Sequence, residues 1–267
     1  MTTIAERART RPYHRPFAPA RHSLALARRS LIKTLRTPEQ LIDVTLQPIT
    51  FVVIFVFLLG GAISGNTHDY LQFLLPAIMV QNLLFASLAT GVNLNTDIDK
   101  GVFDRFRSLP IGRSAPLIGS VLGDLIRYVV TITVLLGFGY ALGFRIQTNP
   151  LATLAACLIT VFFAFCTSWI FVLFGMLMRT PGSVQGMGFI VMFPLTFGTS
   201  MIAPADTLPD WLQAWVKVNP VGNVMDLTRG LMVGGPVAGY VVSTLLWGVG
   251  ILAVFAPLAV RVYRRHA

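Results

Sequence analysis

Hydrophobic residues in this chain gather into long runs that are separated by short polar segments. Six of these runs hold about 20 residues with few or no charges, the length that an α-helix needs to cross a hydrocarbon core about 30 Å thick. The pattern predicts an all-α integral membrane protein with six transmembrane helices. The expected spans are about residues 41–63, 71–93, 117–143, 151–178, 185–203 and 237–260.

Composition and charge agree with this pattern. Hydrophobic residues make up 54% of the chain and charged residues only 12%, far from the average of soluble proteins. Most of the 21 lysines and arginines lie before the first span, after the second or after the last, so the positive-inside rule predicts cytoplasmic termini. The net charge of +10 does not indicate nucleic-acid binding, because no segment outside the spans offers a folded basic face with stacking aromatics.

The basic N-terminal segment divides into two parts ahead of the transmembrane domain, residues 38–267. Residues 1–19 combine prolines with arginines and are expected to form a mobile cytoplasmic tail. Residues 20–37 place leucines on one side of a helical wheel and bases on the other. This pattern predicts an amphipathic helix in the membrane interface, and a solvated basic linker is the alternative.

A charged segment, DKGVFDRFRSLP, follows the second span. Thr96 and Asp99 form a helix start signal and Leu109-Pro110 a stop, so a short helix is expected at about residues 96–109. Its apolar face would hold Ile98, Val102, Phe106 and Leu109, its polar face Lys100, Asp104 and Arg107, with Phe103 at the boundary. Such a helix either lies on the membrane surface or is covered by a protein partner, and the wheel alone leaves both open.

The connection between the last two spans is too polar to cross a membrane and predicts a helical hairpin at about residues 206–233. We expect Thr207 to cap a first short helix, Asn219-Pro220 to end it, and Asp226 to pair with Arg229 in a second. An ordinary surface loop is the alternative. The residues of the expected hairpin that we single out are Pro209, Trp211, Leu212, Trp215, Asn219, Pro220, Asp226 and Arg229.

Polar groups within the spans are few. Asn82, Ala86, Ala89 and Asn93 share one face of the second span, with Gln81 beside it. This face either lines a translocation path or packs closely on another helix, and packing is the simpler expectation. Asp124 and Arg127 lie three residues apart, so we expect a local ion pair rather than a proton relay. Close helix packing is also predicted at four Gly-x-x-x-Gly pairs: Gly61 and Gly65, Gly119 and Gly123, Gly139 and Gly143, Gly182 and Gly186.

The sequence offers no catalytic group, metal site or cofactor site. A P-loop needs a lysine after glycine to hold phosphates, but the lysines are Lys33, Lys100 and Lys217, and none follows a glycine. The two cysteines lack metal-ligand spacing. We therefore do not expect an enzyme, and any ATP would have to be hydrolysed by another subunit.

Two stretches resemble a known family. DIDKGVFDRFRSLPIGRSAPLIGSVLGDLIR and MFPLTFGTSMIAPADTLPDWLQAWVKVNPVGNVMDLTRGL are similar to the segment after the second span and to the outer hairpin of ABC-2 type transporter permeases, of the daunorubicin-resistance type. The resemblance covers nearly the whole chain from about residue 22. It implies the permease subunit of an ATP-driven exporter in a prokaryotic plasma membrane, moving a hydrophobic drug-like molecule, a lipid or a lipid-linked glycan outward.

The resemblance also implies partners. A cytoplasmic ABC ATPase subunit would bind ATP and Mg²⁺, and a second copy or a related permease would complete the path within the membrane lipids. The segment after the second span would be the coupling helix that contacts the ATPase; family members often have Glu where this chain has Asp99. The residues nominated for that contact are Asp97, Asp99, Lys100, Gly101, Phe103, Asp104, Arg105, Phe106, Arg107 and Pro110. An ATP-independent secondary transporter or channel is the alternative function, and a membrane scaffold a third.

Overall fold

The computed structural model describes the backbone of residues 38–102 and 115–266. The predicted tail, residues 1–19, and the predicted interfacial helix, residues 20–37, lie outside the described residues, as does the second half of the predicted coupling helix, residues 103–109. The tail and the interfacial helix stay predictions, and so does the helix expected at residues 103–109.

The described residues form helices joined by loops, and no strand is assigned among them. Among these helices, α2, α3, α5, α6 and α10 are long and apolar enough to cross a membrane, and they coincide with five of the expected spans. In chain order the elements are α2 (Pro38–Ser64), α3 (Thr67–Asp99), α5 (Ala115–Ala141), α6 (Pro150–Leu177), α7 (Pro181–Phe197), a short 3₁₀ turn (Ala205–Thr207), α8 (Asp210–Val218), α9 (Pro220–Val233) and α10 (Ala238–His266).

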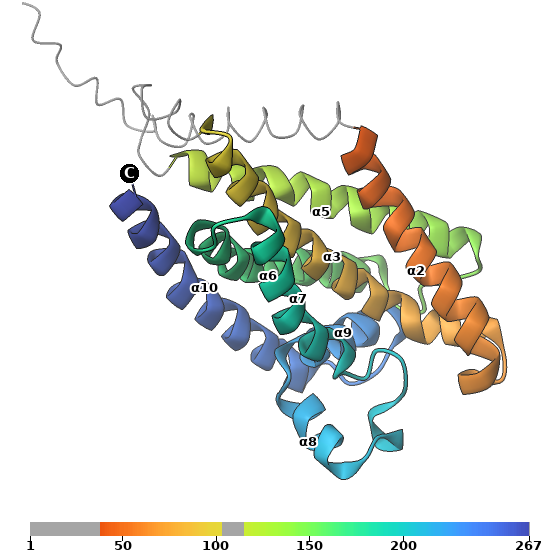
Figure 1. Cartoon of the computed structure of the whole chain (residues 1–267). Helices are drawn as coiled ribbons and strands as arrows, with labels where there is room; N and C mark the ends of the chain where they lie inside the picture. Colours follow the sequence, from red (N-terminus) through yellow and green to blue (C-terminus); the bar gives the residue numbers. More distant parts are fainter. Residues whose placement is uncertain (1–37, 103–114, 267) are drawn as a thin grey trace, which may run out of the picture.

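Helix α3 is the centre of the bundle. It is buried along most of its length and packs against α2, α5, α6, α7 and α9. Helices α2 and α10 lie at the periphery and expose large apolar side chains such as Leu58 and Leu246. Figure 1 shows α8 and α9 at one end of the bundle, which we call the hairpin end, and the last turn of α3 at the other, which we call the Asp99 end.

Helix α7 differs from the span expected at residues 185–203. It has 17 residues, or about 26 Å, which is short for a core of about 30 Å. It begins early because Thr180 Oγ1 accepts a hydrogen bond from Ser183 N at 3.2 Å. It ends at Gly198, whose N–H donates to Pro194 O at 3.1 Å. The residues after it form a loop in which Ser200 contacts α9.

Backbone atoms of α3 and α6 meet directly where these helices cross. A Cβ added at Gly91 would lie 2.2 Å from Phe171 O, and one added at Gly175 would lie 2.5 Å from Gly91 O. No side chain fits between the two backbones, so glycine is required on both helices. Two of the four Gly-x-x-x-Gly pairs make no such contact within this chain, because an added Cβ would meet nothing within 4 Å at Gly61, Gly65, Gly182 or Gly186.

The crossing gives a stability test. Gly91→Ala should destabilise the protein by about 1–3 kcal/mol, because the obstructing atoms belong to the backbone and cannot turn away. The matched control is Gly186→Ala in α7, where the added methyl group meets open space and helix propensity improves. Thermal melts in detergent should show a lower Tm for the first variant only. Equal melting temperatures would contradict the direct backbone contact.

Candidate functional site

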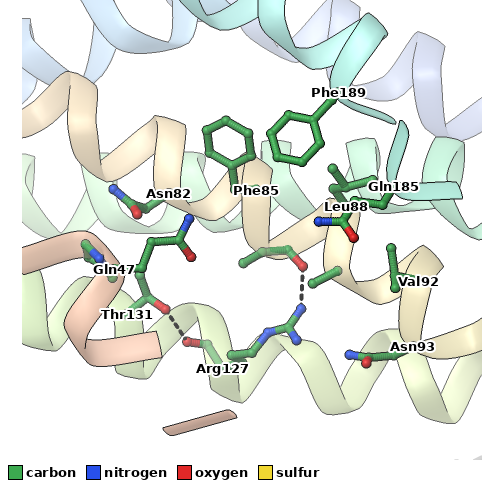
Figure 2. A pocket seen from close by; sticks show the side chains of 13 residues that line it. Gln47, Asn82, Phe85, Leu88, Val92, Asn93, Arg127, Thr131, Gln185 and Phe189 are labelled. Carbon is green, nitrogen blue, oxygen red and sulfur yellow. Dashed lines mark hydrogen bonds between the residues drawn. The ribbon is translucent and has the colours of Figure 1, made fainter. Parts of the chain in front are cut away.

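A cavity of about 380 Å³ lies on one face of α3. Four helices build its wall, and Figure 2 shows Arg127 and Thr131 from α5 on one side of it and Phe189 from α7 on the other. Its size is within the range of sites for drug-sized ligands. The residues around it are Gln47, Pro48, Asn82, Phe85, Ala86, Leu88, Ala89, Val92, Asn93, Arg127, Thr131, Gln185 and Phe189.

The small polar face predicted on the second span lies in this cavity. Asn82, Ala86, Ala89 and Asn93 all belong to the lining, so this side of α3 borders open space rather than packing tightly on a neighbouring helix. Gln81 points elsewhere: its side chain is fully buried, and neither amide atom has a protein partner. Of the three residues nominated for a path, the structure therefore brings two together at the cavity.

Arg127 supplies the positive charge at the cavity wall. The expected ion pair with Asp124 is confirmed, with Arg127 Nη2 lying 3.2 Å from Asp124 Oδ1. The same nitrogen donates to Ala86 O and, at 3.5 Å, to Thr90 Oγ1, while Thr131 Oγ1 donates to Arg127 O at 2.9 Å. Sequence reasoning missed that Arg127 borders the cavity, although a cation inside a span already indicated a special environment.

The cavity combines aromatic rings, small side chains, amides and one guanidinium. Such a lining suits a largely apolar ligand that carries a few polar groups. Within residues 38–102 and 115–266, no three His, Cys, Asp or Glu side chains lie close enough together to hold a metal ion. The lining therefore offers groups that can bind such a ligand.

The nominated coupling segment begins at the Asp99 end of the same helix. The structure differs from the expected start at Thr96, because Thr96 lies in the last turn of α3, where its Oγ1 donates to Val92 O at 2.9 Å. The helix stops at Gly101, which has φ +67°, a backbone conformation that favours glycine. Asp99 and Lys100 are exposed there. The rest of the nominated contact, Phe103, Asp104, Arg105, Phe106, Arg107 and Pro110, lies outside the described residues.

Asn95 fixes the end of α6 to the end of α3. Its Nδ2 donates to Gly175 O and Met178 O, both at 2.8 Å. These carbonyls belong to the last turn of α6, where the helix offers no further N–H. The end of α6 is therefore held at Asn95 of α3. This point lies no more than two helical turns along α3 from the start of the coupling segment.

The two short helices expected in this connection are present as α8 and α9, which meet at Asn219. This residue ends α8 and caps α9, because its Oδ1 accepts from Val221 N at 3.0 Å and Pro220 occupies the first turn. Its Nδ2 donates to Leu195 O and Gly198 O at 2.9 and 2.8 Å, which ties the hairpin to α7. The expected cap at Thr207 is wrong: α8 begins after Pro209 without a side-chain cap, and Thr207 Oγ1 donates to Pro204 O.

Asp226 and Arg229 form the predicted ion pair, with Arg229 Nη1 lying 2.7 Å from Asp226 Oδ1. Ser200 Oγ donates to the same oxygen at 2.6 Å. Arg229 Nε donates to Phe73 O and Nη2 to Ser200 O, both at 3.0 Å, and the guanidinium lies 3.9 Å from the centre of the Phe73 ring. Burial lowers the pKa of Arg229 while Asp226 opposes this change, so the carboxylate compensates a cation that holds α9 against α3.

The first helix of the hairpin presents its tryptophans outward. Trp211 is 73% exposed and Trp215 is 42% exposed, and the indole of Trp215 leaves no room for a side chain at Gly198. Leu212 between them is partly buried. An exposed aromatic pair on a short helix at one end of an apolar bundle is typical of the membrane–water interface.

Comparisons with known proteins agree with this architecture. The chain is 42% identical to the daunorubicin resistance ABC transporter permease protein DrrB1 of Streptomyces coeruleorubidus, over 88% of this chain and 83% of that protein. It is 29% identical to the probable doxorubicin resistance ABC transporter permease protein DrrC of Mycobacterium tuberculosis, over 91% and 88%. It is 28% identical to the putative transport permease ycf38 of Cyanophora paradoxa, over 77% and 72%.

The family model described as "ABC-2 type transporter" matches residues 21–233. This range runs from ahead of α2 to the end of α9 and so includes the cavity, the coupling segment and the hairpin. The chain belongs to the ABC-2 type transporter family.

Proposed function

We propose that this chain is the membrane-spanning permease subunit of an ATP-driven exporter whose ATP is hydrolysed by a separate cytoplasmic subunit. The observation that carries the proposal is the continuity of α3: one helix lines the cavity with Asn82 through Asn93 and then ends at Asp99, beside the coupling segment. Asn93 lies only seven residues, or about 10 Å, from Lys100. Force applied to the coupling segment would therefore reach the cavity wall through one rigid element.

The proposed orientation places the Asp99 end in the cytoplasm of a prokaryotic cell. The basic segments before α2 and after α3 and the basic end of α10 would then lie on the inner side, as the positive-inside rule requires. Helix α7, although short, would cross as the fifth of the six spans, and the exposed tryptophans of α8 would rest at the outer interface. Helix α7 is shorter than the hydrocarbon core, and local thinning of the bilayer or the contacts of α7 with the hairpin would accommodate this difference.

The cavity supports a hydrophobic drug-like substrate best. Its volume and its mixture of phenyl rings with amides suit a flat, largely apolar molecule with a few polar groups, while a lipid or a lipid-linked glycan remains in the proposed class. Two relatives are named for daunorubicin or doxorubicin resistance, so daunorubicin is the first compound to test. A second copy or a related permease would complete the path across the membrane.

The first experiment asks whether the chain needs ATP. Liposomes that contain the purified chain alone should show no export of daunorubicin under a proton or ion gradient. Export should begin when the matching cytoplasmic ABC ATPase and Mg-ATP are added. Gradient-driven flux with the chain alone would instead establish a secondary transporter or channel.

The coupling contact is tested at two aromatic residues. Replacing both Phe103 and Phe106 by Ala should lower ATP-driven export about tenfold, because aromatic anchors dominate the energy of protein contacts, while the chain still inserts normally. The control replaces Phe57 and Phe193 by Ala. These two phenylalanines are 59% and 60% exposed on α2 and α7 and do not belong to the coupling segment. Normal export by the first double variant would refute the coupling assignment.

The cavity is tested by filling it. Ala89→Trp places an indole on the cavity face of α3 and should reduce daunorubicin export about tenfold, because the ring takes the volume that a ligand would need. The control is Ala155→Trp, at an exposed position of α6 outside the cavity lining. The measurement is transport per inserted molecule, with binding of the ATPase subunit checked in parallel. Equal transport by both variants would exclude this cavity from the path.

A further inference from the structure

A second hollow of about 570 Å³ lies between α5 and α6, on the outside of the bundle. Its wall is almost wholly apolar, and Val129, Leu154 and Leu158 are between 54% and 61% exposed. It uses a different face of α5 from the cavity described above, which takes Arg127 and Thr131. We call it the α5–α6 groove.

The length of the α5–α6 groove matches half of a bilayer. Its lining on α5 runs from Val129 to Tyr140, and 11 residue steps of an α-helix rise about 16 Å. One leaflet contributes about half of a hydrocarbon core of about 30 Å. Tyr140 lies one residue from the end of α5, so the groove extends from the membrane interface at the hairpin end toward the middle of the bundle.

An exposed cation stands at the interfacial mouth of the groove. The Arg145 guanidinium lies 4.6 Å from the centre of the Tyr140 ring, and Tyr140 itself lines the groove. Arg145 Nη1 donates to Tyr140 O and Phe144 O, both at 2.9 Å. The salt bridges found among the described residues, those of Arg127 and Arg229, leave Arg145 without a carboxylate partner.

We propose that the α5–α6 groove binds one anionic phospholipid from the leaflet at the hairpin end. One acyl chain occupies the apolar channel, and the phosphate accepts hydrogen bonds from Arg145, which is held in place by the loop and the tyrosine ring. Guanidinium groups bind phosphate through directed, charge-assisted hydrogen bonds. The groove alone would suit any acyl chain; the fixed cation at its mouth selects the charge of the headgroup.

Gly137 is a position from which the groove can be filled. A Cβ added at Gly137 meets nothing within 4 Å, and Gly137 lines the groove, so Gly137→Trp should occupy the acyl-chain site. The control is Gly250→Trp on α10, where an added Cβ also meets open space but which does not line the α5–α6 groove. Leu158→Trp fills the same channel from α6 if the first variant does not give a monodisperse protein.

The experiment measures lipid retention by native mass spectrometry on the full-length chain in mild detergent. Dioleoyl phosphatidylglycerol is titrated against dioleoyl phosphatidylcholine. The wild-type chain and Gly250→Trp should retain phosphatidylglycerol preferentially, and Gly137→Trp should lower its retention about tenfold or more, since the indole displaces the acyl chain and its apolar burial is lost. Unchanged retention in Gly137→Trp and Leu158→Trp would overturn the acyl-chain site.

The headgroup contact is tested separately. Arg145→Gln should weaken phosphatidylglycerol retention about fivefold and remove the preference over phosphatidylcholine, whereas Lys217→Gln, at an exposed cation on α8, should change neither. Equal retention of the two lipids by the wild-type chain would overturn the proposal. So would displacement of both lipids by a second copy of the chain covering the groove. These readouts require neither ATP nor a transported substrate, so they stand apart from the proposed function.

Discussion

The direct contact between the backbones of α3 and α6 is the constraint around which the bundle is arranged. In lipid, helices gain no hydrophobic energy by associating, so close packing and interhelical hydrogen bonds must hold them together. Gly91 and Gly175 bring α3 and α6 so close that neither position tolerates a side chain. This contact fixes the central helix against the longest apolar partner, and the other helices then pack around α3.

Hydrogen bonds from three polar side chains add to this contact at three levels of the bundle. At the hairpin end Arg229 donates to Phe73 O, in the middle Arg127 donates to Ala86 O, and at the Asp99 end Asn95 donates to carbonyls of α6. Each uses a backbone carbonyl, a strong acceptor that does not depend on a neighbouring side chain. Because the surroundings are apolar, each of these donors would be costly to leave unpaired. Helix α3 is thereby joined to α9, α5 and α6.

Local features of this architecture could be predicted from sequence, and tertiary ones could not. The ion pairs of Asp124 with Arg127 and of Asp226 with Arg229 follow from spacing along one helix, and the break at Asn219-Pro220 follows from the chemistry of proline. The glycines at the α3–α6 crossing carry no local motif, since each becomes essential only when the other helix arrives. The small polar face of α3 was expected to pack, because the sequence does not show where the neighbouring helices lie. The bounds of α7 likewise depended on contacts with the hairpin.

The rigidity around the cavity is uneven. On one side, α3 is hydrogen-bonded to α5, α6 and α9. On the other side, the cavity-lining contacts with α7 are apolar: Leu88 fits against Gly188, and the rings of Phe85 and Phe189 lie 5.7 Å apart. Apolar surfaces slide past one another without leaving a polar group unpaired, whereas a hydrogen bond in lipid has no water to replace it. A change in cavity shape would therefore cost least where α7 lines the cavity, while the end of α7 stays hydrogen-bonded to Asn219.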